Sequence, residues 1–207
     1  MLQTGSNFVP NTQSARDILE RMQSDQTDES LAQLVQTGNH QALSTLMERY
    51  TTKLLRYGHR FLSSNDDIAD VVQDVFVAAY QNIKDFDSTR RFSPWIYRIA
   101  HNAFVDALRR QAKGPLYGLD FDRVVPHPIY EDPEENEKEK EEMRVLLVGH
   151  LNDLPRSYRE IVDLYYFEDF KYQEIADVLH IPIGTVGIRL SRARQMLKRS
   201  MKKNPYE

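Results

Sequence analysis

The last quarter of the chain places the strongest limit on the fold. From Tyr172 to Lys203 it reads as two short helices joined by a tight turn and followed by a basic tail. Apolar side chains in the second helix recur at helical intervals and would form one buried stripe: Val186, Leu190, Ala193 and Leu197. This pattern predicts a helix-turn-helix, an arrangement with which proteins read a DNA duplex.

Positive charge is concentrated in the same segment. Between Ile183 and Lys203 there are seven Lys or Arg residues and no acid, although the whole chain has a net charge of -4. A local cluster of this kind suits binding to DNA phosphates. Charge alone fits a solvated basic face equally well, but the preceding helix and Pro182 in the turn favour the DNA-reading interpretation.

The exposed face of the second helix supplies the candidate DNA contacts. Its first turns would reach base edges in the major groove, and its later cations would hold phosphates. The candidates for reading bases are Ile188, Ser191, Arg192 and Gln195. Those for phosphates are Arg189, Arg194, Lys198 and Arg199.

Length and composition favour two compact units. The chain has 207 residues and 41% hydrophobic residues, enough for ordinary cores. From Glu131 to Glu142 there are eight acids against two lysines, a stretch that cannot bury itself and reads as a linker. We expect a polar N-terminal extension over 1–29, a first domain over 30–112, a linker over 113–139 and a second domain over 140–203.

Several kinds of site are excluded by the residue inventory. The chain has no cysteine, and its six histidines show no metal-binding spacing, so no metal and no cofactor are expected. No apolar stretch approaches the roughly 20 residues that a membrane span needs. The expected location is therefore the cytoplasm, without membrane insertion.

The periodic segments are helical, so the predicted fold class is all-α, with two small helical domains. A first helix is expected from Asp28, as its cap, to Gly38, a second from His40 through Phe61, and a third from Asp66 to Ile83. A fourth opens with Ser93 as cap and Pro94 at its first position.

Two helix faces carry residues that a core does not explain. The third helix shows Asp70, Gln73, Asp74 and Val77, an apolar side chain flanked by polar ones, as in a partner-binding patch. The fourth shows Trp95, Arg98, Asn102, Val105 and Arg109, which could stack on and track an unpaired nucleic-acid strand. Trp95 could instead be a core anchor, and His101 between the faces is expected to be a surface residue.

Taken together, these segments closely resemble bacterial RNA polymerase sigma factors of the extracytoplasmic-function (ECF) group, which keep sigma domains 2 and 4. The resemblance covers about 30–112 and 140–202. The matching segments are Asp70 to Tyr80, Phe92 to Arg110, Leu154-Pro155, Tyr172 to Ala176, Gly184 to Val186 and Arg192 to Arg194.

The resemblance implies a role for each face. Asp70, Gln73, Asp74 and Val77 would bind the β′ clamp helices of core RNA polymerase, and the second domain would meet the β flap. A flipped -10 base would enter a pocket that includes Phe86, with Trp95, Arg98, Asn102 and Arg109 along the same strand. The helix-turn-helix, with Thr185 added to the residues above, would read the -35 duplex. An anti-sigma factor is an expected further partner.

The sequence departs from the family in one place, and two other functions stay open. Gly187 and Ile188 follow Val186 where relatives usually carry a basic residue and then Ser, so the -35 consensus cannot be carried over. An autonomous helix-turn-helix regulator would need a dimerisation helix and no polymerase. A nuclease or transposase would need converging carboxylates for metal ions, whereas the acids here lie in helix first turns or in the linker.

Overall fold

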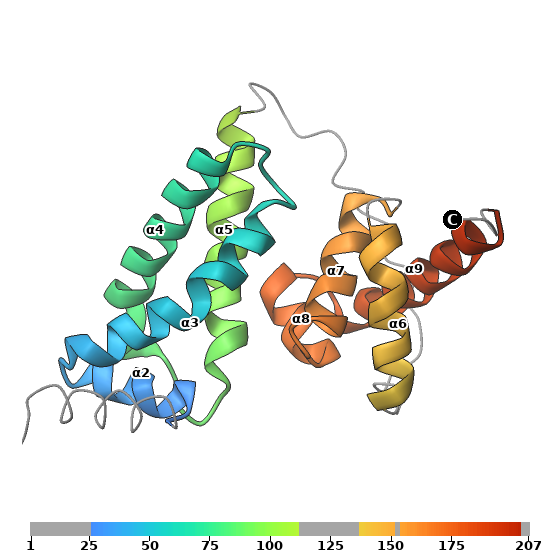
Figure 1. The fold of residues 1–207 in the computed structure, drawn as a ribbon. Helices are drawn as coiled ribbons and strands as arrows, with labels where there is room; N and C mark the ends of the chain where they lie inside the picture. Colours follow the sequence, from blue (N-terminus) through green and yellow to red (C-terminus); the bar gives the residue numbers. More distant parts are fainter. Residues whose placement is uncertain (1–25, 112–136, 152–153, 204–207) are drawn as a thin grey trace, which may run out of the picture.

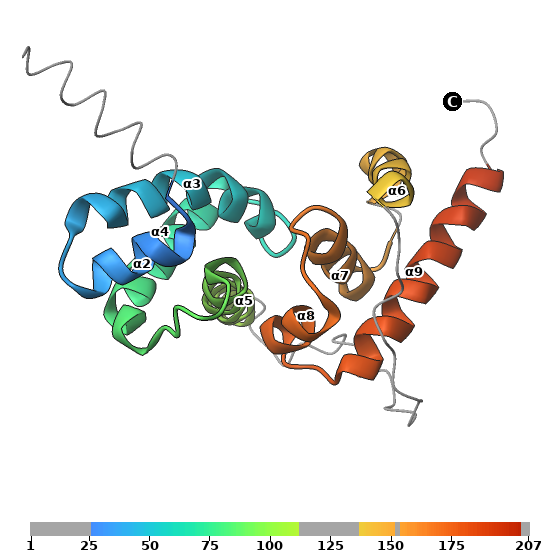
Figure 2. The same cartoon turned by 90° about the horizontal axis from the view of Figure 1, so that it is seen from below.

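The computed structural model describes residues 26–111, 137–151 and 154–203, and all regular structure in these ranges is helical. This confirms the all-α prediction. Figures 1 and 2 show two groups of helices side by side, blue to green and yellow to red. We call them the N-terminal half (α2 to α5) and the C-terminal half (α6 to α9). The N-terminal extension as far as residue 25 and most of the predicted linker lie outside the described residues.

The N-terminal half consists of α2 (Asp28–Gln36), α3 (His40–Gly58), α4 (Asn65–Asn82), a 3-10 turn η1 (Ile83–Asp85) and α5 (Phe92–Gln111). α4 packs on both α3 and α5, and α2 packs on α3. Gly58 allows this close approach: a Cβ there would lie 2.5 Å from Ile68 Cγ2 and 2.6 Å from Phe104 Cζ. The half therefore has one tightly packed apolar core.

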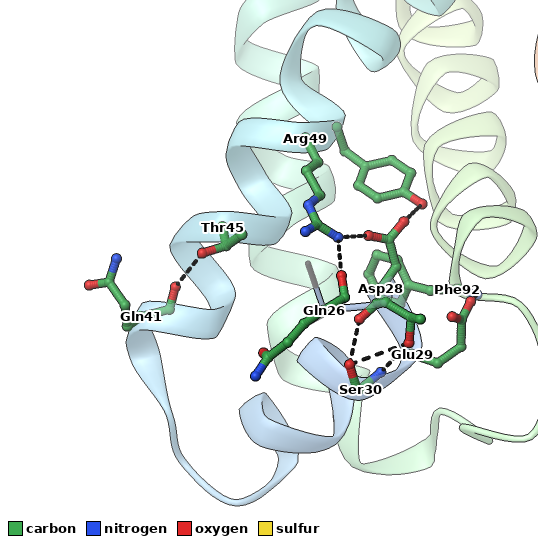
Figure 3. Close-up of polar contacts among 10 residues, drawn as sticks. Gln26, Asp28, Glu29, Ser30, Gln41, Thr45, Arg49 and Phe92 are labelled. Atoms are coloured by element: carbon green, nitrogen blue, oxygen red, sulfur yellow. Dashed lines mark hydrogen bonds and ion pairs between the residues drawn. The ribbon is translucent and has the colours of Figure 1, made fainter. Parts of the chain in front are cut away.

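The starts of two helices, α2 and α5, differ from those predicted from the sequence. Thr27, not Asp28, caps α2, because its hydroxyl accepts from Ser30 N–H. Asp28 instead links α2 to α3 by pairing with Arg49 at 2.6 Å (Figure 3). It also accepts a hydrogen bond from the Tyr50 hydroxyl at 2.6 Å.

The start of α5 is set from outside the helix. It begins at Phe92, one residue before the predicted Ser93 cap. The Glu29 carboxylate on α2 accepts the Phe92 N–H at 2.9 Å, so a residue 63 positions away satisfies this terminal group (Figure 3).

The C-terminal half consists of α6 (Glu137–His150), α7 (Arg156–Tyr166), α8 (Tyr172–Leu179) and α9 (Ile183–Lys203). α6 begins inside the acidic stretch that we predicted to be linker; acids in a first turn suit the helix dipole. The predicted stripe of α9 is buried against α7 and α8: Val186, Leu190 and Ala193 are 0% exposed and Leu197 is 2% exposed.

The turn between α8 and α9 gives the helix-turn-helix its shape. His180 ends α8 in the left-handed conformation, at φ 52°, and the Ile181 N–H then donates back to the Ala176 carbonyl at 3.2 Å. Pro182 follows, and its carbonyl accepts the Thr185 N–H at 2.8 Å. The predicted helix-turn-helix is therefore present, although its second helix is 21 residues long rather than short.

Candidate nucleic-acid interface

The outer face of α4 presents the predicted partner-binding patch to solvent. Asp70, Gln73 and Asp74 are exposed, and 57% of Val77 is accessible. Tyr80, one turn further along, is 43% exposed and was not singled out from the sequence. An apolar centre with a polar rim fits a protein-binding surface.

Phe86 and Trp95 form an aromatic cluster with Phe92 at the start of α5. Ring centroids lie 5.2 Å apart for Phe86 and Trp95, and 5.4 Å apart for Phe92 and each of the other two. Phe86 is 5% exposed and Trp95 is half-buried. Trp95 therefore packs on the core and also reaches the surface, and its contact with a nucleic-acid strand stays a prediction.

A cavity of about 300 Å³ lies over this cluster. Phe86, Trp95 and Arg98 line it from the N-terminal half, together with Arg90 and Arg91. Its opposite wall consists of Glu174 and Asp177 from α8 of the C-terminal half. These two carboxylates therefore lie on the side from which a strand of nucleic acid would approach the predicted base pocket.

A second cavity, of about 530 Å³, contains the other two predicted -10 residues. Asn102 and Arg109 line it from α5, while His180 and Arg189 line it from the C-terminal half. All five predicted -10 residues therefore border cavities between the halves, and one predicted -35 residue faces them.

The outward face of α9 keeps most of the predicted -35 residues accessible. Arg192, Gln195, Lys198 and Arg199 are exposed, and Thr185, Ile188 and Ser191 are partly exposed. Arg194 differs, because its Nε donates to the Tyr166 hydroxyl at 2.7 Å and its guanidinium lies 5.7 Å from the Tyr165 ring centroid. Its contacts assign Arg194 to packing within the C-terminal half.

Buried acids at the boundary between the halves escaped the sequence analysis. Glu160 and Asp163 of α7 are 8% and 1% exposed, and Glu168 is 9% exposed. Glu160 accepts hydrogen bonds from the Tyr57 hydroxyl and the His101 ring, so His101 is half-buried rather than a surface residue. The available signal was the apolar run from Ile161 to Tyr165, which has Glu160 directly before it and Asp163 within it.

Burial and pairing shift the pKa values of these acids in different directions. Burial raises the pKa of Asp163, although Arg60 opposes the shift, and it raises the pKa of Glu168 against Tyr97 and Arg56. Burial would also raise the pKa of Glu160, but His101 and Tyr57 outweigh it, so that this pKa is lowered. The Asp163 and Glu168 carboxylates are thus incompletely compensated where they lie.

Neither a metal-binding cluster nor a membrane-spanning helix is found in the described ranges. No group of three or more His, Cys, Asp or Glu residues there could hold a metal ion. Among the helices with assigned positions, none combines the length and the apolar character needed to cross a bilayer.

Comparison with known proteins gives consistent matches across both halves. The Sigma-70 region 2 model matches 46–114, and the Sigma-70 region 4 model matches 146–197. The ECF RNA polymerase sigma-E factor of Haemophilus influenzae is 33% identical over 178 residues, covering 83% of this chain and 94% of that protein. The ECF RNA polymerase sigma factor SigW of Bacillus subtilis is 30% identical over 179 residues, covering 81% and 93%.

A solved structure shows the same arrangement of helices. The structure of CnrH in complex with the cytosolic domain of CnrY has a TM-score of 0.59 and 27% sequence identity, covering 86% of this chain and 99% of that one.

Proposed function

Because the chain belongs to the ECF group of sigma-70-like factors, which bind core RNA polymerase and direct promoter-specific initiation at -10 and -35 elements, we propose that three of its helices divide this work. α4 binds core polymerase through Asp70, Gln73, Asp74 and Val77. α5 and the Phe86 pocket take the -10 strand. α9 reads the -35 duplex.

The observation that carries this division is the position of the exposed faces. The α4 face and the α9 face lie on different halves, and each half has its own family match. Each face is open although the opposite face of its helix is buried, so it is available to a partner. We propose domain limits of 30–112 and 140–203, as expected from the sequence, although α6 begins slightly earlier, at Glu137. The polymerase contacts would lie on the β′ clamp helices and the β flap.

The set of DNA contacts narrows when side-chain position is considered. Four residues on the outward face of α9 are exposed and suit base and phosphate contacts: Arg192, Gln195, Lys198 and Arg199. Ile188 places an apolar side chain at the duplex, where contact with a thymine methyl group is the suitable interaction. Arg194 instead links α9 to α7 through its hydrogen bond to the Tyr166 hydroxyl.

Two further properties follow from the family. Sigma factors are initiation factors without catalytic activity, and we assign none to this chain. CnrH was solved with the cytosolic domain of CnrY, and the structure neighbours include sigma factors bound to anti-sigma factors. We therefore include an anti-sigma factor among the partners of this chain.

Two single substitutions test the division of labour. Arg192→Ala should weaken discrimination of the -35 element by roughly 5- to 100-fold, the range of one good base contact, and leave core binding unchanged. Asp74→Ala should weaken core binding and leave duplex binding unchanged. Lys138→Ala on α6 and Glu48→Ala on α3 are charge-matched controls on other exposed surfaces.

The readouts are promoter binding by the holoenzyme and association with core polymerase. Equal losses of duplex binding in both variants, with normal polymerase association, would show that the two faces are misassigned. Transcription by sigma-free core polymerase on genomic fragments adds a direct test, since discrete starts should depend on this protein. DNA binding without such starts would favour the autonomous regulator.

A further inference from the structure

Five pairs of a basic and an acidic side chain link the halves with one polarity. In each, the basic side chain comes from the N-terminal half and the acid from the C-terminal half. The pairs are Arg60 with Asp163 at 2.7 Å, His101 with Glu160 at 2.7 Å, Arg91 with Glu174 at 2.9 Å, Arg90 with Asp177 at 3.0 Å, and Arg56 with Glu168. We call Arg56, Arg60, Arg90, Arg91 and His101 the basic track, and their five partners the acidic face.

The basic track continues the predicted -10 site. Arg90 and Arg91 line the same cavity as Phe86, Trp95 and Arg98. His101 precedes Asn102 on α5 and accompanies it in the larger cavity. Tyr57, between Arg56 and Arg60 on α3, contacts the His101 ring at 3.3 Å, so α3 adjoins this end of α5. The five basic side chains thus extend from the aromatic cluster, along α5, onto α3.

The arrangement of halves seen here cannot engage a promoter, an argument that rests on the proposed function. The -10 and -35 elements are about 25 base pairs apart, or about 85 Å of duplex at 3.4 Å per pair. Asn102 and Arg109, assigned to the first element, line one cavity with Arg189, assigned to the second. The halves must separate before both elements are read, and separation uncovers the basic track.

The acidic face is suited to a contact that must be released. Asp163 Oδ2 is buried and has no hydrogen-bond partner within the described residues, and burial raises the pKa of both Asp163 and Glu168. Taking such charges out of water offsets much of their attraction to the cations. The pairs therefore give the contact its specificity while adding little to its strength.

We propose that the basic track is a further phosphate-binding site for single-stranded promoter DNA, extending the -10 site onto α3, and that the acidic face occupies it in place of phosphates until the halves separate. Arg56 and Arg60 are the new residues. A guanidinium pairs with a carboxylate and with a phosphate through the same geometry, which allows one to replace the other. Arg56 is the more accessible of the two, with 51% of its side chain exposed even in this arrangement.

The test measures binding of the full-length chain, without polymerase, to a fluorescent 12-nucleotide single strand of mixed sequence. Glu160→Gln with Asp177→Asn removes two charges from the acidic face, where Glu160 and Asp177 pair with His101 and Arg90, and should tighten binding about tenfold. Asp66→Asn with Glu142→Gln removes the same charge from exposed positions outside it. This control should tighten binding less than threefold.

The second arm removes the new cations in the neutralised background. Arg56→Gln with Arg60→Gln should return the affinity to the starting level. It should also make the salt dependence weaker: the negative slope of log affinity against log salt should become less steep by roughly 1.4, since each phosphate contact to a single strand contributes about 0.7. Lys138→Gln with Lys171→Gln removes equal charge from the C-terminal half and should leave the slope unchanged. Thermal melts of all variants establish that each is folded.

Three results would overturn the proposal. These are equal tightening in both acid-neutralised variants, an unchanged salt slope after loss of Arg56 and Arg60, and preference of the freed track for a polyglutamate peptide over the single strand. The last would identify an acidic protein as its partner. This binding test contains no polymerase, so a negative result would leave core-dependent transcription intact. If instead the proposed function were wrong, core-dependent transcription would be absent and single-strand binding would be unchanged.

Discussion

Packing inside each half differs in chemistry from packing between the halves. Within the N-terminal half, Tyr57, Phe104 and Ile68 are 0% exposed and pack as apolar surfaces. Within the C-terminal half, Ile161 and Leu190 are likewise fully buried. Between the halves, ion pairs and buried carboxylates are added to an apolar contact, in which the Tyr97 and Phe170 ring centroids lie 5.3 Å apart.

This contrast indicates which contacts persist in the folded protein and which can open. Apolar burial stabilises a core in proportion to the area removed from water, at about 25 cal/mol per Å². A buried ion pair returns little net stability, because both charges lose their hydration. We therefore expect each half to persist as a folded unit, and the contact between the halves to open and close.

The largest expected effect lies in an apolar core. Phe104→Ala removes a ring that contacts Tyr57 and Phe61 and should lower the free energy of unfolding by about 3–5 kcal/mol. Chemical denaturation measures it. A loss below about 1 kcal/mol would mean that the core of the N-terminal half is not the permanent element that the comparison requires.

The contact between the halves should respond to a change of one hydroxyl. Tyr57→Phe keeps the buried ring but removes the donor to Glu160 across the boundary. It should shift the closed-to-open equilibrium by about 1.5–3 kcal/mol toward the open form, the usual contribution of a hydrogen bond to a charged acceptor. Energy transfer between labels on the two halves reports it. If the closed population stays constant, the polar contacts are not what holds the halves together.

Gly58 tests how tightly the N-terminal core is packed. The methyl group of Gly58→Ala would collide with Ile68 and Phe104, and overpacking of this kind costs about 1–3 kcal/mol. Gly149→Ala on α6 is the matched control, since nothing lies within 4 Å of a Cβ there. That control should stabilise the protein by up to about 1 kcal/mol, because Ala favours helix more than Gly. Equal effects of the two changes would argue against close packing at Gly58.

The smallest expected effect is a dependence of closure on pH. Burial on closure raises the pKa of Asp163 and Glu168, so closure takes up protons. The closed fraction should rise as pH falls from about 7 to about 5, by less than tenfold. Glu160, whose pKa is lowered, acts in the opposite direction only below its ordinary range near about 4.3. The same scan on Asp163→Asn with Glu168→Gln should be flat, and a slope that persists there would assign the effect to other groups.

The features that sequence predicted well are those set by nearby residues. The buried stripe of α9 follows from 3.6-residue periodicity, and the exposed α4 face follows from the same rule. The cap of α2 was missed by one residue and the start of α5 by two. In α2 the hydroxyl of Thr27, rather than the Asp28 carboxylate, takes the capping position, and the first N–H of α5 is satisfied by Glu29.

The features that sequence missed depend on distant partners. Glu160 pairs with Tyr57 across 103 positions, and Glu168 pairs with Arg56 across 112. The apolar run beside Glu160 is a local signal of its burial, but nothing within one turn of either acid indicates which residue neutralises it. For the same reason Arg194 read as a phosphate contact, although Tyr165 and Tyr166 hold it within the C-terminal half.

The central claim is that the halves are closed in the free protein and separate on the promoter. The chain has no cysteine, so Thr52→Cys on α3 and Glu142→Cys on α6 provide two unique sites for spin labels at exposed positions. Pulsed electron-spin distance measurements on the free chain should give one narrow, short distribution, which lengthens by tens of ångströms when core polymerase and promoter DNA are added. A broad distribution in the free chain, or an unchanged one in the promoter complex, would contradict the claim.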